Sequence, residues 1–467
     1  SPRASQGVVM RAAYNYKKKY FAEFNAAYNG SEQFARGKQY GFFPAVSAGW
    51  TLSNEKFLQD VSWLTNLKIR GSYGLVGNDK IGSGLFYFLD NYSVITGGLS
   101  TDPVYSRPNT GVQFGLPNSI VNYQVAVQTT FGNPDVTWET GTKRNIGVEG
   151  SFFKNALSFT FDLFDEKRVD ILTTRQSGLQ TYGQGYPVLN IGEVYNKGYE
   201  VELNFQHKTG PVNYGLITQV SFAKNKIISR DEPLGRPDYL KQEGKPVGQF
   251  FGYLADGFYA SQADIASSPT NMLGTPIPGD LKYKDYDGNG LIDANDMAPI
   301  GYSRTPEYIF SFAPSVSYKG VSFSMLFQGV TNVSSDVILS EQNNGQQMYE
   351  FQKERWTPAT AATATWPALH SRGNPYINYR LNDFILQDAS YLKIRNAELS
   401  WTIPQVWLSK SKISGLRVFI SGQNLHTWTK YKMYLDPENI NLSNTDFSKQ
   451  SIYPTARVYN FGVNIQL

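Results

Sequence analysis

The sequence predicts an all-β protein, a transmembrane antiparallel β-barrel with short turns at one end and long loops at the other. Three observations support this fold class. Segments of alternating apolar and polar residues recur along the chain, as expected for strands with one face in lipid and one in water. Short and long connections alternate between these segments. Aromatic residues make up 15% of the chain, with 31 Tyr and 29 Phe, whereas charged residues make up only 18%.

Composition argues against several other classes of protein. The 467 residues carry 43 Lys and Arg against 39 Asp and Glu, so the net charge does not indicate a nucleic-acid partner. Because cysteine is absent, disulfides and thiolate metal sites are excluded. No run approaches the roughly 18 apolar residues of a membrane helix, but a membrane strand needs only about 10 alternating residues. The opening SPRASQG has neither an initiator Met nor a signal pattern, so we expect the gene product to begin before Ser1.

The first eight predicted strands lie in the N-terminal half of the chain. The pattern is clear in YEVELNFQ (199–206), in which every odd residue is apolar and every even residue is polar. A period of two means that the two sets occupy opposite faces of a strand. The same period predicts strands at 7–16, 20–29, 44–53, 67–77, 138–152, 156–168, 195–206 and 212–223.

Five further strands are predicted in the C-terminal half. The pair 306–318 and 321–331 forms a hairpin across Lys319 and Gly320, and the others are 387–403, 415–424 and 455–467. Within 387–403 the alternation changes phase near Arg395 and Asn396. Either a β-bulge at this point restores the register, or two short strands meet there.

The connections distinguish a barrel from other β folds. Long connections are predicted at 78–137, 169–194, 224–305, 332–386 and 425–454, and two of intermediate length at 30–43 and 54–66. Loops of such length are uncommon in compact domains, whereas outer-membrane barrels combine short periplasmic turns with long extracellular loops. The alternative is a soluble, secreted β protein that binds or hydrolyses glycans and buries the same apolar face against a second sheet. Aromatic residues near strand ends favour the barrel because they match a membrane-interface girdle: Trp50, Tyr73, Phe152, Tyr199 and Tyr318.

Alternation also predicts which side chains face the barrel lumen. These positions are polar or charged, as expected for an interior that is filled with water or contacts a plug. They are Glu23, Asn25, Lys68, Arg70, Glu149, Asp162, Glu200, Glu202, Asn204 and Gln206. The aromatic residues Tyr349, Phe351, Trp356 and Trp366 lie in a long connection, where they either stack on a substrate or pack the loops together.

One stretch, DYDGNGLIDAND (285–296), has the spacing of a calcium-binding loop. Gly290 stands at the sixth position, where such loops turn sharply, but no helix flanks the segment. Oxygen ligands favour Ca²⁺ over zinc, in a structural role. The alternative is an ion-free turn, because Asp, Asn and Gly are common in turns. The candidate ligands are Asp285, Asp287, Asn289, the Leu291 carbonyl, Asp293 and Asp296.

The sequence gives no indication of an enzyme. Its three histidines, His207, His370 and His426, are far apart, and no nucleophile elbow, phosphate-binding loop or zinc-protease motif occurs. Asp162 and Asp165 are three residues apart in one predicted strand, so they point to opposite faces and cannot form a carboxylate pair.

Several stretches together resemble one family. They are YNYKKKYFAEFNAAYNGSEQF, GFFPAVSAGWTLSNEKFL, LKIRGSYGLVGN, PDVTWETGTKRNIGVEGSFF, NKGYEVELNF, DFILQDASYLKIRNAELSWTIP and YNFGVNIQL. In this order, over nearly the whole chain, they resemble the SusC/RagA family of TonB-dependent transporters of the Bacteroidetes outer membrane. The acidic loop also has a counterpart there, within the connection 224–305.

The resemblance implies that residues 1–467 form the C-terminal part of a larger, plugged barrel. Barrels of this size have 22 strands, so nine strands, a plug domain and a TonB-box segment would precede Ser1, which would lie in an extracellular loop. The implied function is TonB-dependent import of oligosaccharides or oligopeptides, with a SusD-like surface lipoprotein as the lid. The implied partners are that lipoprotein, the TonB complex, the N-terminal half of the same barrel and outer-membrane lipid. Neither the substrate nor the residues that bind it can be identified from the sequence.

Overall fold

The main body of the protein is a thirteen-stranded antiparallel sheet whose strands follow one another in sequence order. The computed structural model describes residues 4–80, 86–95, 113–114, 121–122, 125–178, 186–336, 350–370, 380–409, 412–431, 436–438 and 455–467. The sheet contains β1 (Ser5–Tyr16), β2 (Tyr20–Ser31), β3 (Tyr40–Thr51), β4 (Leu64–Asn78), β9 (Glu139–Phe152), β10 (Leu157–Thr174), β11 (Val188–Thr209), β12 (Val212–Ser229), β19 (Tyr308–Tyr318), β20 (Val321–Thr331), β23 (Tyr391–Thr402), β24 (Gly415–Thr429) and β25 (Val458–Gln466).

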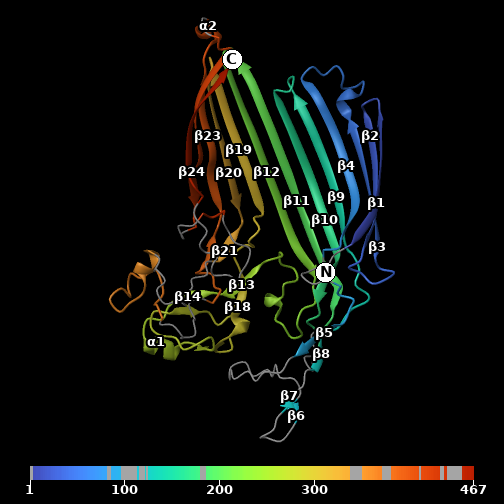
Figure 1. The fold of residues 1–467 in the computed structure, drawn as a ribbon. Helices are drawn as coiled ribbons and strands as arrows, with labels where there is room; N and C mark the ends of the chain where they lie inside the picture. The colour runs from blue at the N-terminus through green and yellow to red at the C-terminus, as the bar shows by residue number, and fades with distance from the viewer. Residues whose placement is uncertain are drawn as a thin grey trace.

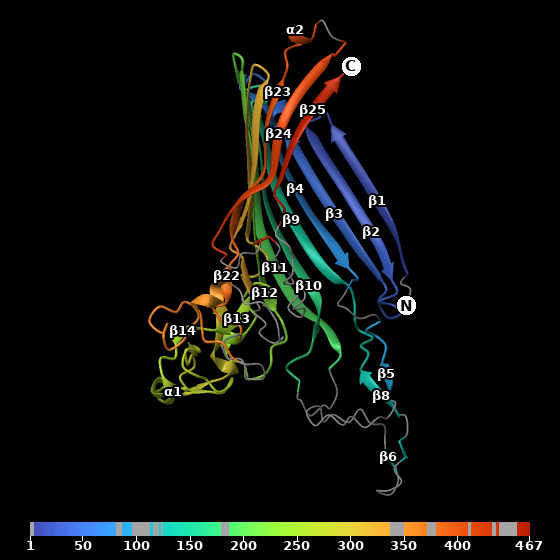
Figure 2. The ribbon, with the colours of Figure 1, turned by 60° about the vertical axis from the view of Figure 1, so that its left-hand side comes forward.

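The sheet curves into a trough, with β1 and β25 as its two edges (Figures 1 and 2). Each of the thirteen predicted segments forms one of its strands, so the predicted fold class and strand order are confirmed. Short hairpin turns and the C-terminus lie at one end, and the long connections lie at the other end with the start of β1 (Figure 1). Within the described residues the sheet does not close on itself, because β1 and β25 do not pair with each other.

Bulges explain where the strands differ from the prediction. β10 was expected to end at Arg168 but continues to Thr174, past a register shift and a left-handed residue at Asp170. A bulge shifts the faces by one residue, so the alternation ends there although the strand continues. In β23 the predicted bulge is confirmed: Asn396 and Ile394 pair with consecutive residues of β20, leaving Arg395 as the extra residue.

The connection predicted at 224–305 begins later in the structure, because β12 continues to Ser229. Residues 230–307, between β12 and β19, fold into a small layer of their own beyond the loop end of the sheet (Figure 1). It pairs β13 (Phe250–Tyr253) with β18 (Met297–Ile300), β14 (Ala255–Phe258) with β16 (Leu281–Tyr283), and β15 (Thr270–Asn271) with β17 (Leu291–Ile292). The helix α1 (Gln262–Ser267) and the 3-10 helices Asp238–Leu240 and Ala294–Asp296 complete it. A buried cluster of Tyr253, Leu281, Tyr283 and Ile292 forms its core, and this packing accounts for a connection of such length.

Short strand pairs and helices also lie in the other connections. The strand pairs are β5 (Asn91–Ile95) with β8 (Val125–Thr130), β6 (Gln113–Phe114) with β7 (Val121–Asn122), and β21 (Ser334–Asp336) with β22 (Leu386–Asp388). The helix α2 (Gln405–Leu408) lies beyond the turn end of the sheet (Figure 1). Two further 3-10 helices span Leu52–Asn54 and Glu350–Glu354.

The outer face of the sheet is apolar and uncovered. Val8, Ile146 and Phe461 keep 71%, 62% and 79% of their surface exposed. A soluble protein seldom exposes an apolar surface of this extent, but a membrane barrel presents one to lipid. Among the described residues, no helix has the length and apolar character required to cross a membrane.

Candidate functional site: polar inner face and acidic loop

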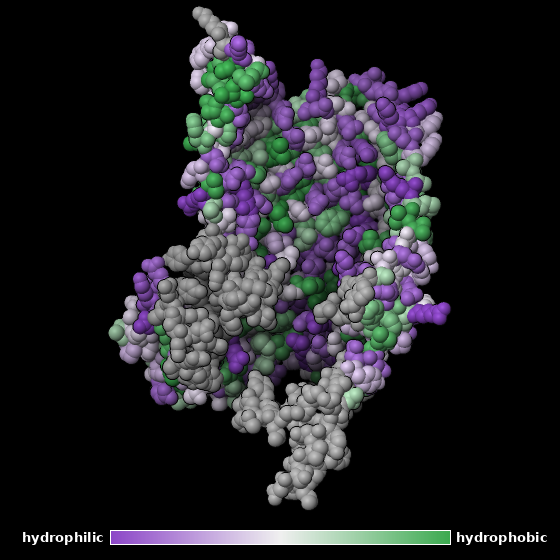
Figure 3. All heavy atoms as spheres, in the orientation of Figure 1, coloured by the Kyte–Doolittle hydropathy of each residue, from purple (hydrophilic) through white to green (hydrophobic). Residues whose placement is uncertain are grey.

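The strand register brings the predicted lumen residues onto one face. Glu23 pairs with Ser47, Ser47 with Ser72, and Ser72 with Asn145, so these side chains form a row across four strands. In the next row, Arg70 and Asp162 flank Gly147. All ten lumen residues predicted from alternation lie in such rows on this face. Hydrophilic side chains gather over the middle of the sheet (Figure 3).

Arg70 is the centre of a charged network on this face. Its Nε donates to Glu149 Oε1 at 2.7 Å, Nη2 donates to Asp162 Oδ2 at 2.7 Å, and Nη1 donates to Asn145 Oδ1 at 3.2 Å. These bonds join β4, β9 and β10. Gly147 leaves space for the network, because a Cβ there would lie 2.6 Å from Asp162 Oδ1 and 2.8 Å from the guanidinium carbon. Charge-assisted bonds of this kind fix side-chain positions more firmly than neutral ones.

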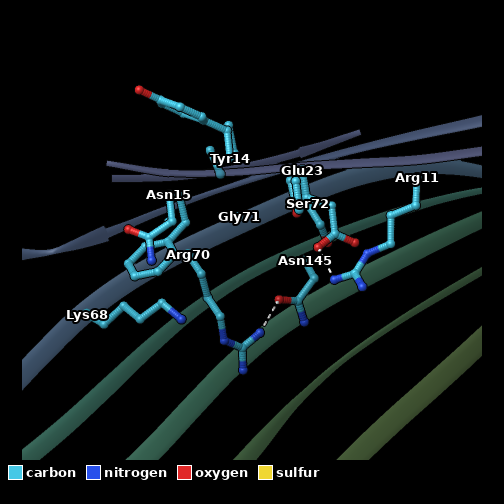
Figure 4. Close-up of a pocket in the computed structure, with 15 residues that line it drawn as sticks. Arg11, Tyr14, Asn15, Glu23, Lys68, Arg70, Gly71, Ser72 and Asn145 are labelled. Atoms are coloured by element: carbon cyan, nitrogen blue, oxygen red, sulfur yellow. Dashed lines mark hydrogen bonds and ion pairs between the residues drawn. The ribbon is translucent and has the colours of Figure 1, made fainter. Parts of the chain in front are cut away.

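Two concavities lie on the inner face of the sheet. The first, of 510 Å³, is lined by Arg70, Lys68, Glu23 and Arg11, and Figure 4 shows Lys68 and Arg70 extending from β4 on the same side as Asn145. Arg11 Nη2 and Glu23 Oε2 are 2.7 Å apart. The second, of 380 Å³, is rich in oxygen atoms, with Asp162, Glu200, Glu202, Gln219, Ser221 and Gln328 among its lining residues. Such a surface can contact a hydrated, polar ligand or a polar protein segment through hydrogen bonds and ion pairs.

The two aspartates of β10 point to opposite faces, as predicted. Asp162 binds Arg70 on the inner face, and Asp165 Oδ1 lies 3.9 Å from Arg144 Nε on the outer face. The sequence analysis missed Asn145 and Gly147. Neither residue has a distinctive motif, and only the pairing of three strands shows that they surround Arg70.

The acidic loop brings three of its predicted ligands together. Ligand oxygens of Asp285, Asp287 and Asp296 all lie within 4.8 Å of one another. Asp285 Oδ2 accepts from Gly290 N at 2.8 Å, so the first position of the loop is bonded to the sixth, and Gly290 has a φ of 82°. This left-handed conformation is available to glycine without strain.

The other predicted ligands have bonds within the loop. Asn289 Oδ1 accepts from Leu291 N at 2.7 Å. Asp293 lies outside the group of three and caps the 3-10 helix Ala294–Asp296 by accepting from Asn295 N. Asp296 is fully buried, and its two oxygens accept from Tyr286 N and Asp293 N, both at 2.7 Å. These backbone donors stabilise the turn and also place the carboxylates close to one another.

The loop aromatics that the structure describes pack against protein. Trp366 is 8% exposed and its ring lies 5.2 Å from that of Phe384. Trp356 covers Gly279, where an added Cβ would meet its ring at 2.4 Å. These two residues therefore pack the loops. Tyr349 and the side chain of Phe351 lie outside the described residues.

The histidines do not share a site. His207 stacks with Phe205 and contacts the tilted ring of Tyr214 near the turn between β11 and β12, and His426 contacts Trp428. His370 bonds to Asp280, and both side chains are almost completely buried. Packing of the loop layer therefore buries His370 beside a carboxylate.

An apolar outer face, a charged inner face and an uneven distribution of connections define an outer-membrane transport barrel. The chain belongs to the TonB dependent receptor-like β-barrel family, whose model matches residues 3–425. The resemblance to the SusC/RagA type is confirmed, and the location in the bacterial outer membrane follows from the family. This location excludes the alternative of a soluble, secreted protein. The relatives are transporters and not enzymes, so the expectation of a non-enzyme is confirmed.

The chain is similar to larger proteins over almost its whole length. It is 28% identical to TonB-dependent receptor P3 of Formosa agariphila, covering 98% of this chain and 45% of that protein. It is 25% identical to TonB-dependent receptor SusC of Bacteroides thetaiotaomicron, covering 98% and 43%. A solved structure of the RagAB peptide importer in the "open-open" state has the same fold, with a TM-score of 0.73 and 20% identity over 100% of this chain and 47% of that chain. The chain thus spans about half the length of the curated relatives that it matches.

Proposed function

We propose that residues 1–467 form the C-terminal barrel portion of a TonB-dependent importer that takes up oligosaccharides or oligopeptides across the outer membrane. The polar inner face carries this proposal, because a face with many charged and polar side chains suits a lumen that is wet and contacts other polar groups. In this proposal a plug domain and the remaining strands complete the barrel, and a SusD-like surface lipoprotein closes over the long connections. The RagAB structure is described as a peptide importer, and this supports the peptide alternative for the present protein.

In this function, the inner face has two tasks. Arg70, Glu149 and Asp162 hold three strands in fixed relation and present a charged surface to the plug. Lys68 and Arg11 add cations to the same concavity. Contacts of this type to a plug are exposed to water on one side, so each is weak enough to be broken when TonB pulls on the plug. No bond of the substrate is made or broken.

Uptake by whole cells tests the proposal. A strain that lacks the full-length protein is compared with a strain that carries it, using fluorescent oligosaccharides and fluorescent oligopeptides as two separate probes. We expect one class of probe to accumulate in the periplasm, and accumulation to stop when a protonophore removes the proton gradient or when TonB is deleted. Equal uptake by both strains for both probes would contradict the proposal.

We also propose that the acidic loop binds Ca²⁺ in a structural role. The three close carboxylates of Asp285, Asp287 and Asp296 and the glycine turn support it, since Ca²⁺ takes six to eight oxygen ligands at about 2.3–2.6 Å. Asn289, the Leu291 carbonyl and Asp293 would supply further oxygens. The ion would offset the repulsion between the carboxylates and hold the loop layer between β12 and β19.

Direct titration tests the metal site. The full-length protein is stripped with a chelator and titrated with Ca²⁺, with Mg²⁺ as the comparison. We expect binding of one Ca²⁺ that is lost in Asp287→Ala and retained in Asp165→Asn, which removes a carboxylate on the outer face of the sheet. An unchanged titration of Asp287→Ala, or no binding at all, would leave the loop as a turn stabilised by its own hydrogen bonds.

A further inference from the structure

A shallow groove of 460 Å³ lies on the outer face of the sheet and crosses β9, β10, β11 and β12. These strands are in the middle of the sheet, far from the edges β1 and β25. Along one part the groove is apolar, with Ile146, Leu163, Tyr199 and Phe222, and at the other end it is charged, with Arg144 and Lys197. It therefore has the polarity of a lipid molecule, with a region for acyl chains and a region for a headgroup.

The charged end of the groove lies at the extracellular surface of the membrane. His207 contacts Tyr214 near the turn end. His207 and Lys197 lie on the same face of β11. They are separated by ten residues, or roughly 33 Å along the strand at about 3.3 Å per residue. With a strand tilt of about 40°, this corresponds to roughly 25 Å across the membrane, the height of the apolar band of an outer-membrane barrel. Lys197 is therefore placed where the headgroups of the outer leaflet lie.

Cations concentrate in two rows at this level. In the first row, Asp165 pairs with Arg144 and Lys197, and Lys197 pairs with Lys224. In the second row, Tyr195 pairs with Lys167 on one side and Lys226 on the other. Since neighbouring strands are about 4.8 Å apart, these five cations lie on four adjacent strands within roughly 15 Å.

The carboxylates nearby neutralise these cations only in part. Asp165 lies near Arg144. Glu193 is 2.9 Å from Lys167, and Glu307 is 2.9 Å from Lys224. Five cations and three carboxylates leave an excess of positive charge. In the part of the chain that the structure describes, neither Lys197 nor Lys226 has a carboxylate within 4.0 Å, and both are exposed.

Lys197 and Lys224 lie directly opposite each other on neighbouring strands, so their positive charges repel each other. Like charges directly opposite each other on neighbouring strands destabilise a sheet. Both side chains are exposed beside a ring of aromatic residues, Tyr199, Phe222 and Tyr308, of the kind that marks a membrane interface. An anion bound between the two ammonium groups would convert this repulsion into attraction.

We propose that this groove binds a phosphorylated glycolipid of the outer leaflet, with a phosphoryl group held by Lys197 and Lys224 and an acyl chain lying on Ile146, Leu163 and Tyr199. Charge complementarity supports this occupant, because phosphoryl groups attract clustered lysines at membrane surfaces. The apolar part of the groove continues down the outer face into the hydrocarbon layer and so matches an anchored lipid better than a soluble anion. The bound lipid would lie beside β9 to β12 at the base of the long connections.

Binding of defined lipids to the full-length protein in non-ionic detergent tests this site. The probe is phosphorylated lipid A, and the comparisons are dephosphorylated lipid A, phosphatidylethanolamine and inorganic phosphate, with complexes quantified by native mass spectrometry. A lysine near an anionic lipid surface contributes roughly fivefold in affinity, so Lys197→Gln with Lys224→Gln should weaken binding about 30-fold. Lys143→Gln is the matched control, because Lys143 neighbours Arg144 in sequence but points to the inner face and lies near Glu166.

The outcomes separate the proposal from its alternatives. Strong binding of phosphorylated lipid A, lost in the double variant and kept in Lys143→Gln, supports the site. Equal binding of the phosphorylated and dephosphorylated forms, or full competition by inorganic phosphate, overturns it. Heat-dependent migration on gels verifies that each variant is folded. If the double variant does not fold, Lys197→Arg should retain binding and Lys197→Gln alone should weaken it about fivefold, and unchanged binding in Lys197→Gln would then overturn the proposal.

Discussion

Replacing Leu203 by Arg tests which face of β11 contacts lipid. Leu203 lies four residues from His207 and six from Lys197, which places it roughly 10 Å above the lower boundary of the membrane and about 15 Å below the upper one. It is therefore close to the middle of the apolar band, where an Arg on the lipid face costs about 2–4 kcal/mol. A loss of about 3 kcal/mol lowers the folding equilibrium constant roughly 150-fold.

Asn204→Arg is the matched control, because residue 204 is the next along the strand and faces the lumen, with Glu202 two residues away on the same face. We expect its free energy of unfolding to change by less than about 1 kcal/mol, because the new charge stays in water. The assay is denaturant unfolding of the full-length protein in lipid vesicles, followed by the shift in gel migration between folded and unfolded barrels. Equal destabilisation of the two variants would refute the assigned register and with it the orientation of the sheet.

Three other predictions concern the terminal strand, the acidic loop and the charged network. Deletion of residues 459–467 should abolish membrane insertion, because it removes most of an edge strand; normal surface labelling of the deletion variant would contradict this. Removal of Ca²⁺, or Asp287→Ala, should increase proteolysis within residues 224–305 and leave the strands intact; unchanged digestion patterns would argue against a structural ion. Arg70→Gln should lower the free energy of unfolding by about 1–3 kcal/mol, because Asp162 keeps a largely buried charge without its partner. Adding Asp162→Asn to this variant should restore part of the loss; a further loss would show that the ion pair is not the cause.

The strands could be predicted from the sequence because lipid and water impose a period of two on every membrane-crossing segment. In β11, YEVELNFQ alternates without exception, and the pairing of Leu203 with Phe159 and Thr218 places it on the expected face. The bulge near Arg395 was also predictable, since an extra residue reverses the phase of the alternation. The ends of β10 and β11 could not be predicted, because bulges near Asp170 and Glu193 disrupt the alternation while the backbone pairing continues.

The candidate sites could be predicted only in part. The acidic loop is contiguous, so its ligand spacing was visible in the sequence, and the structure brings Asp285, Asp287 and Asp296 together. The loop layer was not predictable: Tyr283 is buried against Tyr253 and accepts a hydrogen bond from Asn382, which lies in a different connection. Burial raises the pKa of the Tyr283 phenol, and no local pattern indicates this environment.

The sequence by itself determined the positions of the strands and the two faces of each strand, because these depend on neighbours one or two residues apart. The alternation of short and long connections then determined the class of fold. Only the tertiary structure decided which charged side chains form ion pairs. Arg70 and Glu149 are 79 residues apart and Arg70 and Asp162 are 92 apart, yet each pair is joined at 2.7 Å. The lysines of the outer groove likewise become neighbours only through strand pairing. Register between strands is set by bulges, turns and packing along the whole sheet, so contacts across strands cannot be read from any one segment.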